Sequence, residues 1–168
     1  MKIHLYKSLL LAAIVLLGSI YAHADFDVGK KAFLVNLGFT RGGMALGADY
    51  EYGADRSFGL GGYFRTYPKD KLLNGNGLTA VGAFIRPHFN RQSWDFYVSP
   101  GFGIISYQPA REASASLFGP SMAIGLLYEL KPNMSLGIEN MFLASWFGEN
   151  AHRGALSEEI LLKFRLIL

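Results

Sequence analysis

Four histidines are the natural candidates for acid–base chemistry in this chain, because imidazole titrates near neutral pH. His4 and His23 lie in an apolar N-terminal region, and His88 lies among alternating apolar residues. His152 lies in a polar segment near the C-terminus. The polar residues around it are Glu149, Arg153, Ser157, Glu158 and Glu159. A Ser–His–Glu hydrolase set can be drawn from this segment, and solvated loop residues are the alternative interpretation.

A second set of charged residues occurs at every other position within apolar segments. Its acidic members are Asp49, Glu51, Asp95, Glu129 and Glu139, and its basic members are Arg65, Arg86, Lys163 and Arg165. Charges inside a protein must be paired, because an unpaired one costs several kcal/mol. The near-equal numbers favour ion pairs that fill an interior, and a proton or ion path is the alternative. No cluster has metal-ligand spacing, so we expect no metal and no cofactor.

The elements that carry these residues are strands, because apolar and polar side chains alternate with a period of two. In one of them, Met44, Leu46 and Ala48 share a face, while Gly47 and Asp49 share the other. The pattern predicts a slip of register near Gly61–Gly62 and places Phe84 on the polar face. Small glycines on the polar face suit the narrow interior of a closed barrel. The segments with this pattern are 33–40, 44–52, 58–65, 81–89, 94–104, 118–129, 136–146 and 162–168.

The connections between these segments alternate in length. Turn-forming sequences occur at 53–56, 90–93 and 131–133, and longer polar links occur at 68–76, 108–115 and 148–156. The first link, at 41–43, is short. Short turns on one side and long loops on the other are typical of antiparallel transmembrane barrels. Aromatic residues near the strand ends predict two interfacial belts.

The N-terminal region predicts an export signal. Lys2 and Lys7 precede an apolar run of about twelve residues, which is too short to span a membrane as a helix. Ala22–His23–Ala24 offers small residues for signal peptidase, so we expect cleavage before Asp25. This divides the chain into a signal peptide, 1–24, and a barrel domain, 25–168.

Charge and cysteine content exclude several functions. The net charge is +3, with 16 basic and 13 acidic residues, and two of the basic residues belong to the leader. The remaining charge of +1 gives no reason to expect nucleic acid as a partner. The absence of cysteine excludes disulfides and thiolate metal sites.

With these strands in place, the chain resembles the small eight-stranded outer-membrane proteins of the OmpX/OmpA type. The resemblance rests on the glycine-rich stretch 97–103 and on the strand–turn–strand unit 125–136. It implies an eight-stranded antiparallel transmembrane β-barrel with up-and-down topology in the outer membrane. Such proteins commonly end in an aromatic residue, whereas Leu168 is the last residue here and Phe164 the last aromatic one.

The C-terminal third also resembles the PagL-type lipid A deacylases in its layout. Those enzymes carry a His-x-Ser-Asn stretch, which corresponds here to Leu143-Ala144-Ser145-Trp146. Ser145 matches the nucleophile, but leucine stands at the position of the base. If the protein were such an enzyme, Ser145, His152 and Glu158 would be its catalytic residues, and His152 would have to reach back from the loop to act as the base.

These observations predict a monomeric, non-enzymatic barrel of the outer membrane, with envelope structure or surface interaction through outer loops as its role. The expected partners are membrane lipid, lipopolysaccharide and a surface ligand. A lipid A hydrolase and a narrow pore are the alternatives.

Overall fold

The computed structural model describes residues 28–40, 43–68, 77–109, 113–148 and 154–168. Among these residues, no helix is long and apolar enough to cross a membrane. Eight strands account for nearly all of the described chain. They are β1 (Lys31–Thr40), β2 (Gly43–Asp55), β3 (Phe58–Tyr67), β4 (Gly77–Arg91), β5 (Trp94–Gln108), β6 (Ala115–Lys131), β7 (Met134–Ser145) and β8 (Gly154–Ile167).

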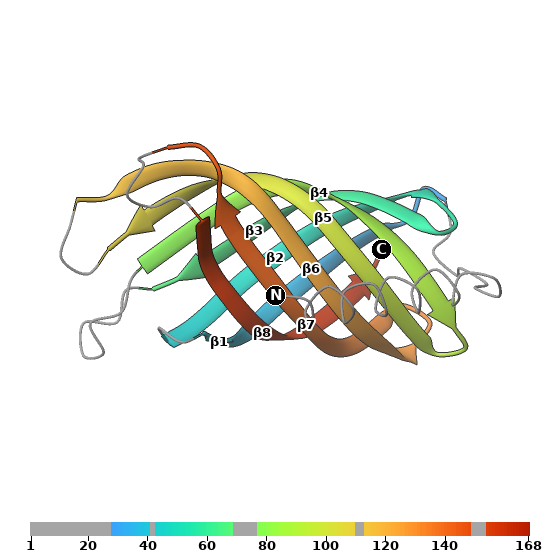
Figure 1. Ribbon diagram of the computed structural model, residues 1–168. Coiled ribbons are helices and arrows are strands. Elements are labelled where there is room, and N and C mark those ends of the chain that lie inside the picture. Colours follow the sequence, from blue (N-terminus) through green and yellow to red (C-terminus); the bar gives the residue numbers. More distant parts are fainter. Residues whose placement is uncertain (1–27, 41–42, 69–76, 110–112, 149–153) are drawn as a thin grey trace, which may run out of the picture.

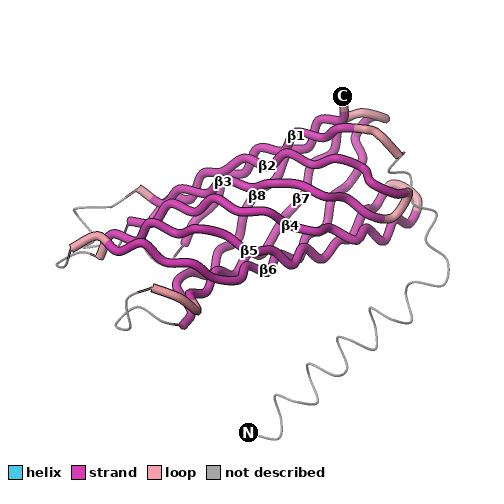
Figure 2. The backbone as a smooth tube through the Cα atoms, turned by 90° about the horizontal axis from the view of Figure 1, so that it is seen from above, coloured by secondary structure: helices cyan, strands magenta, loops and turns pink. Residues whose placement is uncertain are grey.

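Each strand pairs antiparallel with its neighbours in sequence, and β1 also pairs with β8, so the sheet closes into a barrel (Figure 1). This confirms the predicted fold, an up-and-down meander. Residue pairs can be followed from Leu37 around the barrel in both directions. One route reaches Ser116 on β6 through β2 to β5, and the other reaches Leu126 through β8 and β7. The ten-residue offset between them is the shear that tilts the strands, as Figure 2 shows.

The connections follow the predicted alternation. Two-residue turns join β2 to β3, β4 to β5 and β6 to β7 at one end of the barrel. We call this the tight-turn end. Longer links join β3 to β4, β5 to β6 and β7 to β8 at the opposite end, which we call the loop end. The last strand begins at Gly154, earlier than the sequence pattern predicted, so the preceding link is shorter.

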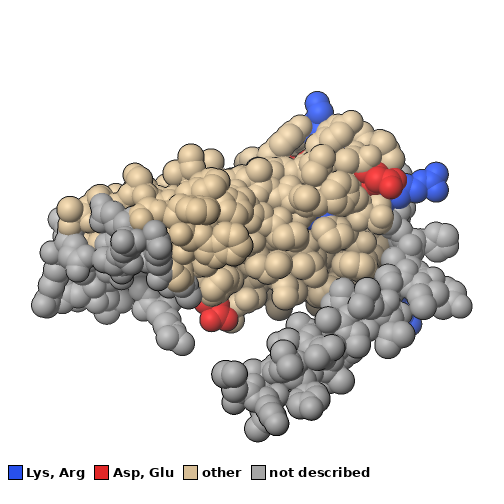
Figure 3. Space-filling view, turned by 45° about the horizontal axis from the view of Figure 1, so that its top comes forward, with Lys and Arg blue, Asp and Glu red and all other residues tan. Residues whose placement is uncertain are grey.

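Most large side chains on the outer face of the barrel are apolar and exposed. On β1 they are Phe33, Val35, Leu37 and Phe39, and on β6 Phe118, Met122, Ile124 and Leu126. Figure 3 shows one side of the barrel, where Lys, Arg, Asp and Glu atoms are few between the two ends. A surface of this kind is expected to face lipid, because in water it would be a large exposed apolar patch.

The predicted register slip near Gly61–Gly62 was wrong. Leu60, Gly62 and Phe64 alternate without interruption on the outer face, and both neighbouring strands pair in register across this region. The irregularity lies at Gly53 and Asp55, next to the β2–β3 turn. Gly62 misled the prediction because it has no side chain to show that its position faces outward. Phe84 faces the lumen, as predicted, and is 5% exposed.

Glycines on the inner face make room for larger lumen side chains. A Cβ atom added at Gly125 would lie 2.1 Å from Cζ of Tyr97, whereas one at Gly62 on the outer face would have its nearest contact at 3.3 Å. We therefore expect Gly125→Ala to lower the free energy of unfolding by about 1–3 kcal/mol, because the ring of Tyr97 must move. Gly62→Ala, the matched control, should cost less. Urea unfolding in lipid vesicles measures both, and equal losses would contradict this account.

Candidate functional site

The lumen contains a continuous network of ion pairs, which begins around Lys163. Its Nζ atom lies 2.7 Å from Oδ2 of Asp49 and also contacts Glu139. Arg65 contacts the same two carboxylates, with Nη2 2.9 Å from Oε1 of Glu139. All four side chains are essentially inaccessible to solvent. Two cations and two carboxylates therefore form a closed, buried group at the centre of the barrel.

Arg86 extends this group toward the tight-turn end. Its guanidinium donates to Asp49 at 2.9 Å and to Glu51 at 2.7 Å. The same guanidinium lies 4.0 Å from the ring centroid of Phe84 and 4.6 Å from that of Tyr97. This contact explains why a phenylalanine occupies the lumen face, since an aromatic ring stabilises a cation over its face. The hydroxyl of Tyr97 donates to Glu139 at 2.7 Å, which links the two parts of the network.

His88 connects the network to the tight-turn end of the lumen. Its Nε2 lies 2.6 Å from Glu51, and its Nδ1 lies 2.9 Å from Asp95. Because both ring nitrogens face carboxylate oxygens, a doubly protonated imidazole can donate to both. Asp95 also forms an ion pair with Arg165, whose Nη2 donates to the hydroxyl of Ser135 at 3.1 Å.

Glu159 is a further buried carboxylate next to this network. With His88 protonated, five cationic side chains contact four carboxylates, those of Asp49, Glu51, Asp95 and Glu139. Glu159 is 1% exposed, and its carboxylate lies 3.9 Å from Nε of Arg65. Its carboxylate therefore lies beside the network, at the edge of ion-pair distance from one guanidinium. The sequence had suggested a loop position for Glu159, and this was wrong: it lies in β8, on the same face as Leu161 and Lys163.

Apolar side chains fill the part of the lumen nearer the loop end. They form one packed cluster, which includes Tyr67, Leu78, Ile105, Leu117 and Leu143. Within the described residues, the lumen thus has a charged part whose side chains pair with one another and a part packed mainly with apolar side chains.

The structure places the predicted inner-face charges in the lumen. Eight of them are buried, and Glu129 is half-buried near the β6–β7 turn. The paired network among them was the interpretation that the sequence favoured. Sequence reasoning did not identify the hydroxyl of Tyr97 as a member, although its position on the lumen face beside Ser99 was a usable signal.

The three residues of the hydrolase alternative are placed differently. Ser145 ends β7, is 1% exposed, and its hydroxyl donates to the carbonyl of Phe147 at 3.3 Å. Glu158 is exposed on the outer face of β8. His152 lies outside the described residues. The structure therefore does not bring Ser145 and Glu158 together, since they occupy opposite faces of the barrel wall. Among the described residues, no group of acidic and histidine side chains is arranged to hold a metal ion.

No protein-family model matches the chain, and no curated protein matches it in sequence. Several solved structures match its fold. The N-terminal β-barrel domain of Pseudomonas aeruginosa OprF superimposes with a TM-score of 0.61 at 13% identity, over 84% of this chain and 98% of that domain. Neisserial surface protein A gives a TM-score of 0.56 at 14% identity, over 82% of this chain and 94% of that one.

Ail, the attachment invasion locus protein of Yersinia pestis, gives a TM-score of 0.50 at 13% identity, over 83% of this chain and 100% of that one. Such low identities establish the shared architecture and leave activity open. Together with the closed register and the apolar exterior, they show that this chain has the fold of the small eight-stranded outer-membrane β-barrels.

Proposed function

We propose that the protein is an exported, monomeric barrel of the outer membrane, and that it acts without catalysis as an envelope component or through its outer loops. Signal peptidase would cleave before Asp25, and the loop end would face outward. The observation that supports this most directly is the division of side chains between the two faces of the wall. Apolar groups cover the outside, and the charges inside are paired with one another.

A role at the cell surface agrees with this architecture. The charges of the lumen pair with one another, and loops carried by a rigid scaffold are the part of a protein that commonly varies and carries function. Two proteins of the same fold carry surface roles in their names, one a surface protein and the other an attachment and invasion protein. We infer that lipopolysaccharide surrounds the barrel and that the outer loops meet a surface ligand.

The experiment that tests the absence of catalysis is mass spectrometry of lipid A from cells with and without the protein. We expect identical spectra, because the Ser145 hydroxyl is buried and no described imidazole or carboxylate activates it. Loss of an acyl chain that Ser145→Ala restores would contradict the proposal and identify a hydrolase.

We also expect no single-channel current from the purified protein in planar bilayers. The ion pairs of Lys163, Arg65 and Arg86 close the charged part of the lumen, and the apolar cluster fills the rest. A small barrel filled by side chains is not a pore. Steady current that scales with salt concentration would contradict the closed lumen, and a designed transmembrane β-barrel of similar fold provides a size-matched comparison.

A further inference from the structure

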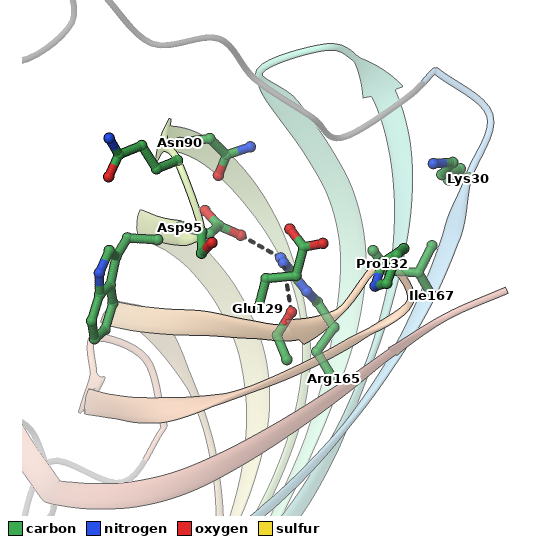
Figure 4. A pocket seen from close by; sticks show the side chains of 11 residues that line it. Lys30, Asn90, Asp95, Glu129, Pro132, Arg165 and Ile167 are labelled. Atoms are coloured by element: carbon green, nitrogen blue, oxygen red, sulfur yellow. Dashed lines mark hydrogen bonds and ion pairs between the residues drawn. The ribbon is translucent and has the colours of Figure 1, made fainter.

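A small cavity opens at the tight-turn end of the barrel, with a volume of about 160 Å³. Residues from the β4–β5 turn, the β6–β7 turn and the segment before β1 line it (Figure 4). One water occupies about 30 Å³ in the liquid, so this volume corresponds to about five waters. It accommodates a group the size of a small amino acid or one end of a short peptide.

The floor of this cavity is fixed by the end of the lumen network. The guanidinium of Arg165 is held by Asp95 and by the hydroxyl of Ser135, as the dashed lines in Figure 4 show. Asp95 is held in turn by His88 at 2.9 Å. Arg165 is 6% exposed and Asp95 is 5% exposed. The floor is thus a preorganised polar surface of a kind that binding sites use.

The rim of the cavity presents charges of both signs. Glu129 is half-buried and lies next to Arg165, while Lys30 lies across the opening from Asn90 (Figure 4). Within the described part of the chain, no hydrogen bond or ion pair is found for the carboxylate of Glu129, although its backbone amide donates to Ser93. A solvent-facing carboxylate beside a fixed guanidinium can accept a cationic group from a ligand.

Gln92 lines the cavity as part of the two-residue β4–β5 turn. Its φ is 56°, and it is the one non-glycine residue with positive φ in the described chain. Such a φ is usual in the two-residue turns that join antiparallel strands, so this wall of the cavity is a tight hairpin turn.

From these features we propose that the tight-turn end binds a small zwitterion, namely an amino acid or the end of a short peptide. The ammonium group of the ligand contacts Glu129, and its carboxylate lies toward Lys30 and Arg165. The inference rests on the proposed function in one respect: with the loop end facing outward, the cavity would open to the periplasm, and the ligand would be a periplasmic molecule. Binding itself requires only the folded barrel.

The test is an NMR titration of the protein refolded in detergent micelles, with the backbone amides of Gln92 and Ser93 as reporters. The probes are glycylglycine, its N-acetyl derivative and its C-terminal amide. We expect saturable shifts with glycylglycine, and weaker binding when either charge is capped. Absence of a saturable shift, or equal binding of the two capped probes and glycylglycine, would overturn the proposal.

Variants test which residue contacts each charged end of the ligand. Glu129→Gln should weaken glycylglycine binding about tenfold, because it removes one charge-assisted hydrogen bond, and it should leave the N-acetyl probe unchanged. Lys30→Gln should weaken glycylglycine binding and leave the binding of the C-terminal amide unchanged. Lys131→Gln is the matched control, since Lys131 is an exposed residue of the β6–β7 turn region that does not line the cavity. Heat-dependent gel mobility establishes that each variant is folded. A Glu129→Gln variant that binds like the parent would refute the site whether or not the protein lies in the outer membrane.

Discussion

Replacing Lys163 with methionine should lower the free energy of unfolding by about 3–5 kcal/mol, the usual cost of removing one partner from a buried ion pair. Lys163 Nζ is shared by Asp49 and Glu139, and none of the three side chains is accessible to solvent. Without the ammonium, the two carboxylates face each other with only Arg65 and Arg86 to balance them. Urea unfolding in lipid vesicles, followed by tryptophan fluorescence, measures this loss.

Two further variants distinguish the loss of a buried ion pair from the loss of a positive charge at any position. Lys131→Met, at an exposed position, should change the free energy of unfolding by no more than about 0.5 kcal/mol. Lys163→Met combined with Asp49→Asn should lose less than the sum of the two single variants, because the second change removes the carboxylate that the first leaves unpaired. If the effects are additive, the two groups do not interact, and the network as described is wrong.

The side chains that face the lumen could be predicted from the sequence, because the direction of a side chain in a strand is set locally. Side chains alternate across a strand, so Asp49 and Glu51 had to share a face with Gly47, and that face had to be the one without large apolar groups. The same rule places Lys163 and Arg165 in the lumen. It failed at Gly62, which has no side chain to mark its face.

The partners within the network could not be predicted in this way. Lys163 and Asp49 are separated by 114 positions in the sequence, and they meet only because β8 pairs with β1 and the shear sets their heights along the axis. Neither closure nor shear is encoded in a single strand. The position of Glu159 was missed for a related reason, since pairing of β8 with β7 extends the strand into a polar segment that looks like a loop by composition.

The outer face of β6 is the best place to test whether the barrel wall contacts lipid. Ile124 is 37% exposed and lies near the middle of this strand, between Met122 and Leu126 on the same face. We expect Ile124→Arg to lower the free energy of unfolding in bilayers by about 2–4 kcal/mol, because a charge near the centre of the membrane must be desolvated. The measurement is urea unfolding of the variant in phospholipid vesicles.

Leu130→Arg is the matched control, because Leu130 lies on the same strand and the same face but next to the turn. There the membrane gives way to water, and the cost should fall to about 0–1 kcal/mol. If the outer face contacts lipid, the cost of arginine depends on depth in the membrane. In water, two exposed aliphatic positions would tolerate arginine equally. Equal stability of the two variants would therefore mean that the apolar outer face is covered by something other than a bilayer.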